Sequence, residues 1–216
     1  MSSQKRSRPS QDLDARPQKR SRLEAPIDAG QIEYLQLENF MCHRNLEVSL
    51  KPGVNVITGN NGSGKSAILA ALQVALGSKA KNTSRGASMR EVIKEGEDSC
   101  RVTVHISNGG EDAYEAETYG SKILVVRRIS KTSTSSYKIQ SENGQTVSSS
   151  VKDLRKILDH FNIHLDNPCT VMNQELSRVF LANASPSSKY IFFLQATQLQ
   201  KMIEDFDSSM NHKVQM

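Results

Sequence analysis

Apolar and polar residues alternate in the region that follows residue 30, as they do in strands that bury one face. Three short strands are predicted, over 32–37, 46–50 and 54–57, and the third runs into Gly59. The alanine- and leucine-rich segment 66–76 then predicts a helix, with Gly77 placed as its C-terminal stop. We therefore expect a helix packed under a sheet.

The middle of the chain is predicted to be rich in strands. A short helix over 89–94 precedes strands over 100–106, 114–119 and 123–129. Two further strands, over 136–140 and 145–148, flank Asn143-Gly144, which is the strongest short hairpin signal in the sequence. Apolar residues at 151, 154, 157, 158 and 161 then line one face of a predicted amphipathic helix.

A last helix is predicted to begin at Ser185-Pro186, with serine suited to the N-cap and proline to the first helical position. Its apolar residues are spaced alternately by four and three positions, at Phe192, Ala196, Leu199, Ile203, Phe206 and Met210. This spacing is typical of a heptad seam, so we expect residues 185–216 to begin a coiled coil that needs a partner helix. Because about three heptads is short for a coiled coil, an ordinary surface helix is the alternative.

Charge is concentrated at the start of the chain. The 216 residues carry a net charge of +5, and residues 1–28 hold seven basic and four acidic side chains, which leaves +2 for the rest. With few large apolar residues, 1–28 is expected to be a disordered tail. Its two basic clusters, Lys5-Arg6 and Lys19-Arg20-Ser21-Arg22, favour a two-part nuclear import signal, and a solvated basic tail is the alternative.

Composition narrows the class of protein further. Apolar tracts fall short of the roughly 20 residues that a membrane-spanning helix needs, so no membrane partner is expected. The three cysteines are odd in number and far apart, which predicts neither a disulfide framework nor a Cys-x-x-Cys metal site. His160 and His164 are four residues apart, but no further ligand cluster accompanies them, so a structural role is favoured over zinc binding.

The residues after the third predicted strand satisfy the phosphate-loop pattern G-x-x-x-x-G-K-[ST], and they are Gly59, Asn60, Asn61, Gly62, Ser63, Gly64, Lys65 and Ser66. The glycines allow the backbone N–H groups from Gly62 through Ala67 to point at phosphate oxygens. Lys65 is placed to reach the β- and γ-phosphates and Ser66 to hold Mg²⁺, at the positive end of the predicted helix. The motif predicts binding of a nucleotide with Mg²⁺.

Hydrolysis needs more than this loop. A P-loop ATPase also uses an acidic residue at the end of a second buried strand, and no run of four apolar residues here ends in Asp or Glu. The apolar run 123–126 leads into Arg127-Arg128, Asp159 lies on a predicted helix, and Glu204 lies among the heptads. A self-contained P-loop kinase would need a second acid and an arginine-rich lid, and neither is visible. Half of a catalytic site is therefore missing from this sequence.

Three segments resemble the N-terminal head of structural maintenance of chromosomes (SMC) proteins. They are Leu37-Glu38-Asn39-Phe40-Met41-Cys42-His43, the phosphate loop, and the stretch from Asn167-Pro168 to Gln174-Glu175. Residues 189–199, Lys-Tyr-Ile-Phe-Phe-Leu-Gln-Ala-Thr-Gln-Leu, together with residues 158–163, are similar to the sixth subunit class of the five-six complex. The resemblance covers about residues 30–205.

The resemblance implies an α/β, ABC-type (SMC/RecF-like) P-loop NTPase. Residues 30–184 would be the N-terminal half of a split ATPase head, with a mixed sheet plus a β-rich subdomain, and 185–216 would begin the coiled-coil neck. The acid, signature motif and switch histidine would come from a C-terminal half-head. The chain alone is therefore expected to be inactive, and its end at Met216 implies a fragment, truncated product or short isoform.

Site residues and partners also follow from the resemblance. Gln174 would contact Mg²⁺ and the attacking water, and Arg85 the γ-phosphate or DNA. Asn39 and His43 would lie near the base and ribose. ATP and Mg²⁺ are the implied cofactors, and the implied partners are a fifth-subunit head, a kleisin at the neck helix, and DNA without sequence preference. The implied setting is DNA repair by recombination at chromosomes in the nucleus. The alternative is a non-catalytic module that nucleotide stabilises.

Overall fold

The computed structural model describes residues 28–77, 89–165, 167–174, 177–178, 180, 185–199, 202–203, 206–207 and 209–210. The basic clusters of the N-terminal tail and Arg85 lie outside these described residues.

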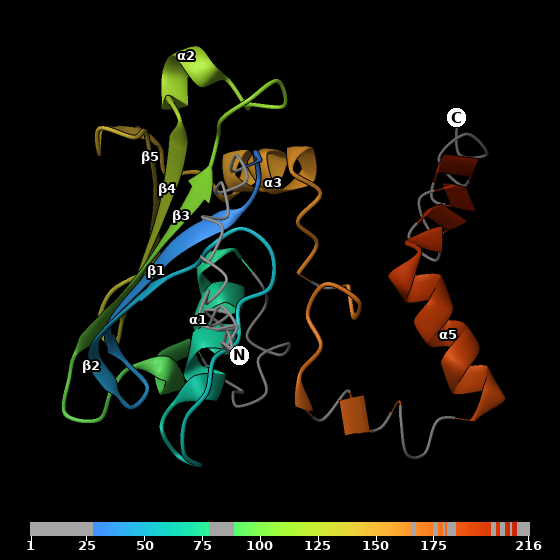
Figure 1. The fold of residues 1–216 in the computed structure, drawn as a ribbon, viewed down its shortest axis with the longest axis horizontal. Helices are drawn as coiled ribbons and strands as arrows, with labels where there is room; N and C mark the ends of the chain where they lie inside the picture. The colour runs from blue at the N-terminus through green and yellow to red at the C-terminus, as the bar shows by residue number, and fades with distance from the viewer. Residues whose placement is uncertain are drawn as a thin grey trace, which may run out of the picture.

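One antiparallel sheet organises the described residues (Figure 1). It has the order β2-β1-β3-β4-β5-β6, and its strands are β1 (Ile32–Phe40), β2 (His43–Ser49), β3 (Ser99–Ser107), β4 (Lys122–Ser130), β5 (Ser136–Gln140) and β6 (Thr146–Ser148). The alternation in the sequence has its cause here, since Leu35 and Leu37 of β1 are fully buried while Gln36 between them faces the other side. The hairpin predicted at Asn143-Gly144 joins β5 to β6, and Gly144 adopts a φ of +77°.

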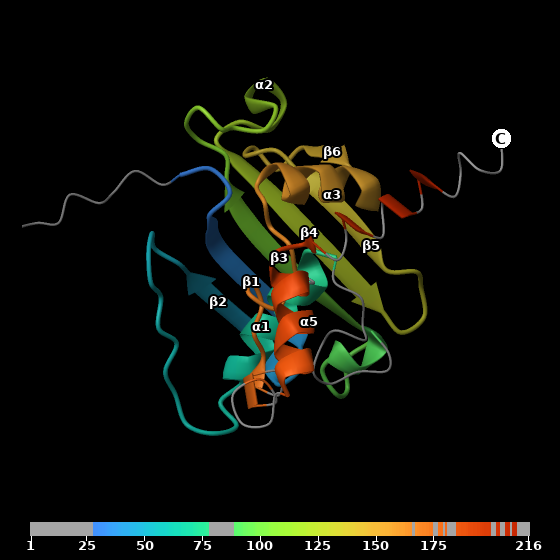
Figure 2. The same cartoon turned by 90° about the vertical axis from the view of Figure 1, so that its right-hand side faces the viewer.

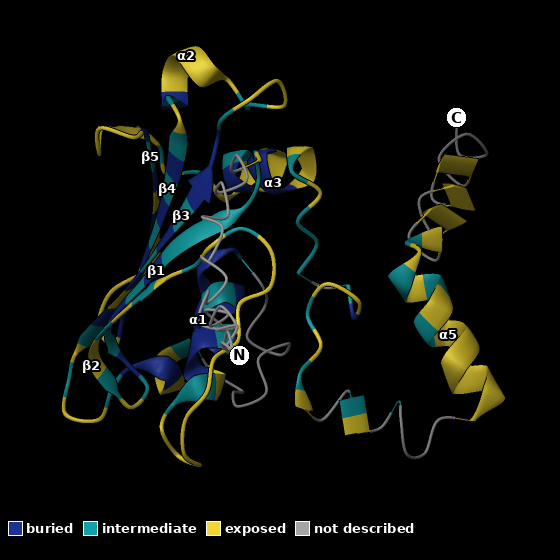
Figure 3. Ribbon diagram, in the orientation of Figure 1, coloured by how far each residue is buried: buried dark blue, intermediate teal, exposed yellow. Residues whose placement is uncertain are grey.

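Two helices cover the same face of this sheet, as the two perpendicular views show (Figures 1 and 2). They are α1 (Lys65–Ala75) and α3 (Val151–His160), and both match the predicted helices. Small residues such as Ala71 and Ala75 are fully buried in α1, so this helix can lie close to the strands. Ile157 of α3 is also fully buried. The core is the layer between these helices and the sheet (Figure 3).

Three further helical elements are described: the 3₁₀ helix η2 (Met89–Val92), α2 (Ala116–Tyr119) and α5 (Pro186–Ala196). The first lies within the short helix predicted over 89–94. Ser185 caps α5 by accepting a hydrogen bond from the Ser188 N–H at 3.2 Å, as the Ser-Pro signal predicts. In the described part of the chain, no helix combines the length and apolar character that a membrane crossing requires.

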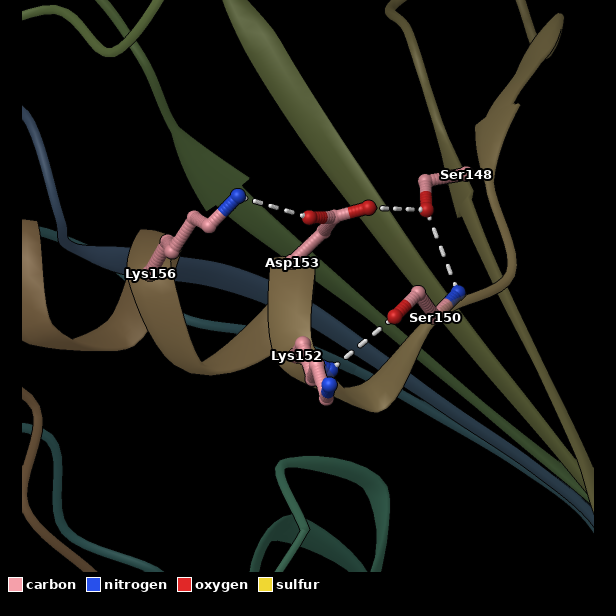
Figure 4. A network of polar contacts seen from close by, with 5 residues as sticks. All are labelled: Ser148, Ser150, Lys152, Asp153 and Lys156. Atoms are coloured by element: carbon pink, nitrogen blue, oxygen red, sulfur yellow. Dashed lines mark hydrogen bonds and ion pairs between the residues drawn. The ribbon is translucent and has the colours of Figure 1, made fainter.

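The start of α3 is fixed by a polar network (Figure 4). Ser150 is the N-cap and accepts a hydrogen bond from the Lys152 N–H at 3.1 Å. Ser148, at the end of β6, donates its hydroxyl to Asp153 at 2.7 Å, and Lys156 bonds the other oxygen of that carboxylate at 3.1 Å. The hydrogen bond from Ser148 and, to a smaller degree, that from Lys156 hold the pKa of the Asp153 carboxyl below its usual value.

An arginine lies on the core side of the sheet. Arg127 is 9% exposed, its guanidinium stacks over the Tyr137 ring at 4.1 Å, and burial lowers its pKa to about 10. Within the described part of the chain, neither the Arg127 Nε nor the Tyr137 hydroxyl has a hydrogen-bond partner. The neighbouring Cys100 thiol is buried as well, which raises its pKa to about 11. Arg127 is therefore held by packing and by the aromatic face rather than by an ion pair.

Two predicted strands are wrong. Residues 54–57 form no strand, and Val54 is 93% exposed. No described strand pairs with this segment, and Asn55 instead bonds the backbone of Lys51 at both its N–H (2.9 Å) and its C=O (2.7 Å). Residues 114–119 contain α2 instead of a strand, because Asn108 bonds the Tyr114 N–H and C=O and the Gly120 C=O. Backbone groups that a strand would have paired with a neighbouring strand are thus hydrogen-bonded locally.

Two further expectations are corrected in detail. The sheet is antiparallel in all the pairs that the structure describes, whereas a mixed sheet was expected. The helix predicted to continue from Phe192 to Met210 is interrupted, since α5 ends at Ala196 and Gln198 has a φ of +59°. Thr197 bonds back to the Phe193 C=O through its hydroxyl at 2.8 Å, which satisfies a helix-end carbonyl at the break.

Candidate functional site

The phosphate-loop residues lie between the exposed segment 54–58 and the first turn of α1. Gly64 is the N-cap of α1 and has a φ of +87°, a conformation that glycine adopts without steric cost. A Cβ at Gly64 would clash with the His43 imidazole and would lie 2.7 Å from the Cys42 Sγ. The loop therefore touches the turn between β1 and β2, and glycine is needed at this contact.

Lys65 closes the loop on itself. Its ammonium donates to the Gly59 C=O at 2.6 Å and to the Asn60 C=O at 2.7 Å. The Ser63 N–H donates to the Asn60 C=O at 3.2 Å and shortens the turn. The amino group is thus held at the mouth of the loop by two carbonyl dipoles, in a solvent-exposed place.

The start of α1 suits an anion. Gly64 supplies no side-chain cap, and the first turn contains no acidic residue. Ser66 is exposed, and the helix dipole adds partial positive charge at this end. Among the amides predicted to face phosphate, those of Ser63 and Ala67 already donate within the loop, the latter to the Gly64 C=O at 2.9 Å. The anion-facing groups are then chiefly the amides from Gly64 to Ser66 and the Lys65 ammonium.

The β1–β2 turn supports the loop from one side. His43 Nε2 lies 3.3 Å from the Gly64 C=O, so His43 does join the site. Asn39 points elsewhere, since its amide donates to the Glu97 carboxylate at 3.2 Å. Lys94 donates to the Cys42 C=O at 3.2 Å and, through its backbone, to the Asn39 C=O at 2.8 Å. Sequence reasoning gave no role to Cys42, although it lies in one of the family-like segments, or to Lys94, whose contacts with the turn span up to 55 residues.

Gln174 is not joined to the loop. It is an exposed helical residue, and no hydrogen bond within the described part of the chain links it to residues 59–67. Arg85 lies outside the described residues. The roles expected of these two side chains therefore stay predictions.

Exposed apolar side chains lie directly before the loop. Val54, Val56 and Ile57 are 93%, 78% and 43% exposed. A second exposed set lies at and beyond α5, where Tyr190, Ile191, Phe193, Leu199, Met202, Ile203, Phe206 and Met210 are each at least 40% exposed. In both sets the exposed apolar side chains occur together rather than scattered singly along the chain.

The two histidines for which the sequence favours a structural role over zinc binding have separate partners. His160 Nε2 lies 2.9 Å from the Asp112 C=O, and His164 Nε2 lies 2.8 Å from the Asn162 side-chain oxygen. No group of three potential metal ligands among His, Cys, Asp and Glu occurs in the described part of the chain.

Comparison with known proteins places the chain in a family. The AAA domain family matches residues 34–215. Structural maintenance of chromosomes protein 6 of Dictyostelium discoideum is 45% identical over 185 residues, and the human protein of that name is 44% identical over 187. Each alignment covers 86% of this chain but only 16% or 17% of the relative, so the chain spans about one sixth of these proteins.

Solved SMC heads share the fold. A structure described as concerning ATP-driven dimerization and DNA-stimulated activation of SMC ATPases has a TM-score of 0.62, 22% identity, and coverage of 76% of this chain and 98% of that one. An Smc head of Pyrococcus furiosus bound to the C-terminal domain of ScpA has a TM-score of 0.57, 21% identity, and coverage of 85% and 48%. The α/β P-loop head expected from the sequence is thereby confirmed as the fold class.

Proposed function

We propose, from the premise that the chain belongs to the AAA domain family and to the sixth class of structural maintenance of chromosomes proteins, that it binds ATP with Mg²⁺ as one half of a chromosome ATPase head. The observation that supports this most directly is the loop of residues 59–66. There a lysine ammonium and an acid-free helix start face the same exposed place.

The residues of the loop fit a nucleotide polyphosphate. Lys65 would exchange its two carbonyl acceptors, on Gly59 and Asn60, for phosphate oxygens, which attract an ammonium far more strongly. The amides at the start of α1 would donate to the same anion, and the Ser66 hydroxyl would ligate Mg²⁺. Mg²⁺, when bound, would neutralise charge on the phosphates. Gly64 lets the backbone approach closely because no side chain intervenes.

Hydrolysis is proposed to need a second polypeptide segment. No described acidic side chain bonds the loop, and the sequence contains no run of four apolar residues that ends in Asp or Glu. The exposed apolar residues at 54–57 stand directly before the loop, where a strand of a C-terminal half-head would bury them. That half-head would supply the acid, and Gln174 and Arg85 would complete the water and phosphate contacts.

The wider assembly is proposed from the relatives and from α5. A fifth-subunit head would close over the nucleotide, and a kleisin would dock at the neck helix, whose apolar side chains are exposed. The ATPase cycle would act on DNA that is held without sequence preference, during repair by recombination. A nuclear and chromosomal location is supported by the two basic clusters within 1–22. Replacing Lys19, Arg20 and Arg22 by alanine should move a fluorescent fusion to the cytoplasm.

The decisive experiment compares steady-state ATP hydrolysis by the purified chain alone and after co-expression with the C-terminal half-head of a relative. We expect negligible turnover by the chain alone and measurable turnover by the pair. Lys65→Ala should abolish turnover by the pair, while the exposed Lys51→Ala, a matched lysine outside the loop, should leave it unchanged. Robust turnover by the chain alone, or failure of the two halves to co-purify, would contradict the split-head proposal.

The same experiment separates the alternative of a non-catalytic module. The exposed apolar side of α5 favours a partner-binding role that does not need hydrolysis. In that case ATP would raise the melting temperature of the pair, Lys65→Ala would remove this rise, and turnover would stay at background.

A further inference from the structure

The face of the sheet opposite α1 and α3 forms a shallow dish. Eleven outward-facing side chains of β1, β3, β4 and β5 line a hollow of about 470 Å³. Pairing between the strands arranges these side chains, together with Tyr34, in three parallel rows. The rows are Glu38–Arg101–Arg128–Ser136, Gln36–Thr103–Val126–Lys138 and Tyr34–His105–Leu124–Gln140.

Cations are in excess at one end of the dish. Arg101 and Arg128 are direct cross-strand partners, an arrangement of like charges that destabilises a sheet unless an anion lies near. Glu38 neutralises only Arg101, at 3.3 Å. Arg128 and the neighbouring Lys138 are exposed, and neither forms an ion pair with a described residue. Two positive charges are therefore left for an external partner.

The floor of the dish is apolar. Val126 and Leu124 face outward from β4 and are only half-buried, although no helix of the described residues covers this side of the sheet (Figure 1). The Tyr34 and His105 rings pack against each other, with their centroids 4.7 Å apart and their planes tilted by 38°, and they close the end opposite the arginines. An apolar floor with a cationic end and amide-bearing walls matches a ligand that is itself amphipathic.

We propose that this dish is the docking site for an acidic, amphipathic peptide segment of a partner protein. Carboxylates of the segment pair with Arg128 and Lys138, and its apolar side chains cover Val126 and Leu124. The dish extends about 13 Å along β4 from Leu124 to Arg128, which matches four or five residues of extended chain or the width of one helix. The inference goes beyond the proposed ATP site and does not depend on it.

A nucleic acid fits the dish less well than a peptide. Tight binding to a duplex usually engages many phosphates, and the dish offers three cations, one of them already paired with Glu38. Residues 29–216 carry a net charge of only +2, which gives little long-range attraction for a polyanion. A nucleic acid would also place its charged backbone against the apolar side chain of Val126 without a compensating interaction.

The test uses a displayed library of random twelve-residue peptides, selected on the full chain and counter-selected on the double variant Arg128→Glu/Lys138→Glu. We expect recovered peptides in which Asp or Glu alternates with apolar residues. Fluorescence anisotropy with the synthetic peptides should show binding at least about tenfold weaker to the double variant. Val126→Thr, which changes shape little, should weaken binding to a smaller degree.

The control is Lys152→Glu/Arg155→Glu, an equal charge reversal at exposed positions of α3 on the other side of the sheet. It should bind like the parent chain, and circular dichroism should confirm that all variants are folded. The proposal is overturned if no acidic peptides are recovered or if their binding ignores the dish variants. It is also overturned if the dish variants instead abolish binding of a 30-base-pair duplex or a self-association seen by light scattering.

Discussion

Two apolar stretches that are close in sequence have opposite fates in this molecule. Most of α1 is buried against the sheet, with Ala71 and Val74 fully enclosed, whereas Val54 and Val56, 15 to 20 positions earlier, are 93% and 78% exposed. Both stretches are apolar enough to belong in a core. The difference is that α1 meets a complete antiparallel sheet, while the segment before the loop meets no described strand. An apolar pattern indicates which residues tend to be buried. They are buried only where a neighbouring element is present to cover them.

The sharpest way to break this comparison is to truncate one buried residue of the sheet that α1 covers and one residue of the exposed segment. Leu37→Ala removes a fully buried side chain opposite α1 and should lower the free energy of unfolding by about 2–5 kcal/mol. Val56→Ala removes a side chain that is already in water and should change it by less than about 0.5 kcal/mol. Urea denaturation followed by circular dichroism measures both values. Equal losses would show that residues 54–57 are packed in solution.

A second substitution tests whether the loop depends on the turn beside it. Gly64→Ala must tolerate a φ of +87° and a clash with His43, so we expect a loss of about 1–3 kcal/mol and weaker binding of a fluorescent ATP analogue. Gly62→Ala is the control, because its φ is +82° but a Cβ there would meet no atom within 4 Å. Similar effects of the two variants would show that backbone strain alone, and not the contact with the turn, is responsible.

A third test concerns Arg127 on the core side of the sheet. Here we expect a substitution to raise the free energy of unfolding, and by less than the losses above. Replacing the buried Arg127, whose Nε has no hydrogen-bond partner among the described residues, by methionine removes a desolvated charge but also its stacking on Tyr137. We expect stability to rise by about 1 kcal/mol. Tyr137→Phe, which removes a buried hydroxyl without a partner, should be neutral within about 0.5 kcal/mol in the same urea titration. A clear loss with Arg127→Met would indicate that the guanidinium holds a partner in solution.

The smallest expected effect concerns the polar network at the start of α3. Hydrogen bonds from Ser148 and Lys156 lower the pKa of Asp153, so its stabilising contribution is present above the unfolded-state pKa of about 3.9 and is lost as the pH falls below it. Asp153→Asn should therefore lower the melting temperature slightly at pH 7 and not at pH 3. The control Asp159→Asn, at an exposed position of the same helix, should show no such pH dependence.

Much of the fold follows from local pattern, and its failures have physical causes. The strands β1, β2, β3 and β4 and the helices α1 and α3 could be predicted because their apolar residues repeat with the period of the element and reach the core. The strand expected at 54–57 fails because pairing is not a local property. The strand expected at 114–119 fails because a single side chain, Asn108, satisfies the backbone there.

The candidate site also contains some residues that could be predicted from the sequence and others that could not. The eight loop residues could be read from the sequence because each type has one mechanical reason for its position. The contact of Cys42 and His43 with Gly64 could not, since it depends on how a hairpin turn meets a helix start 21 residues later. The cationic end of the dish is equally hidden, because Arg101 and Arg128 meet only through strand register.

The closeness of Cys42 to Gly64 has a practical consequence, because it provides a labelling position at the loop. Cys42 is exposed, whereas Cys100 is buried and keeps its proton to about pH 11, so a thiol-reactive dye would pass over the latter. Once the exposed Cys169 is replaced by serine, an environment-sensitive fluorophore could be attached to Cys42 alone. The hairpin turn would then report, in real time, on movements of a loop in which no residue has been altered.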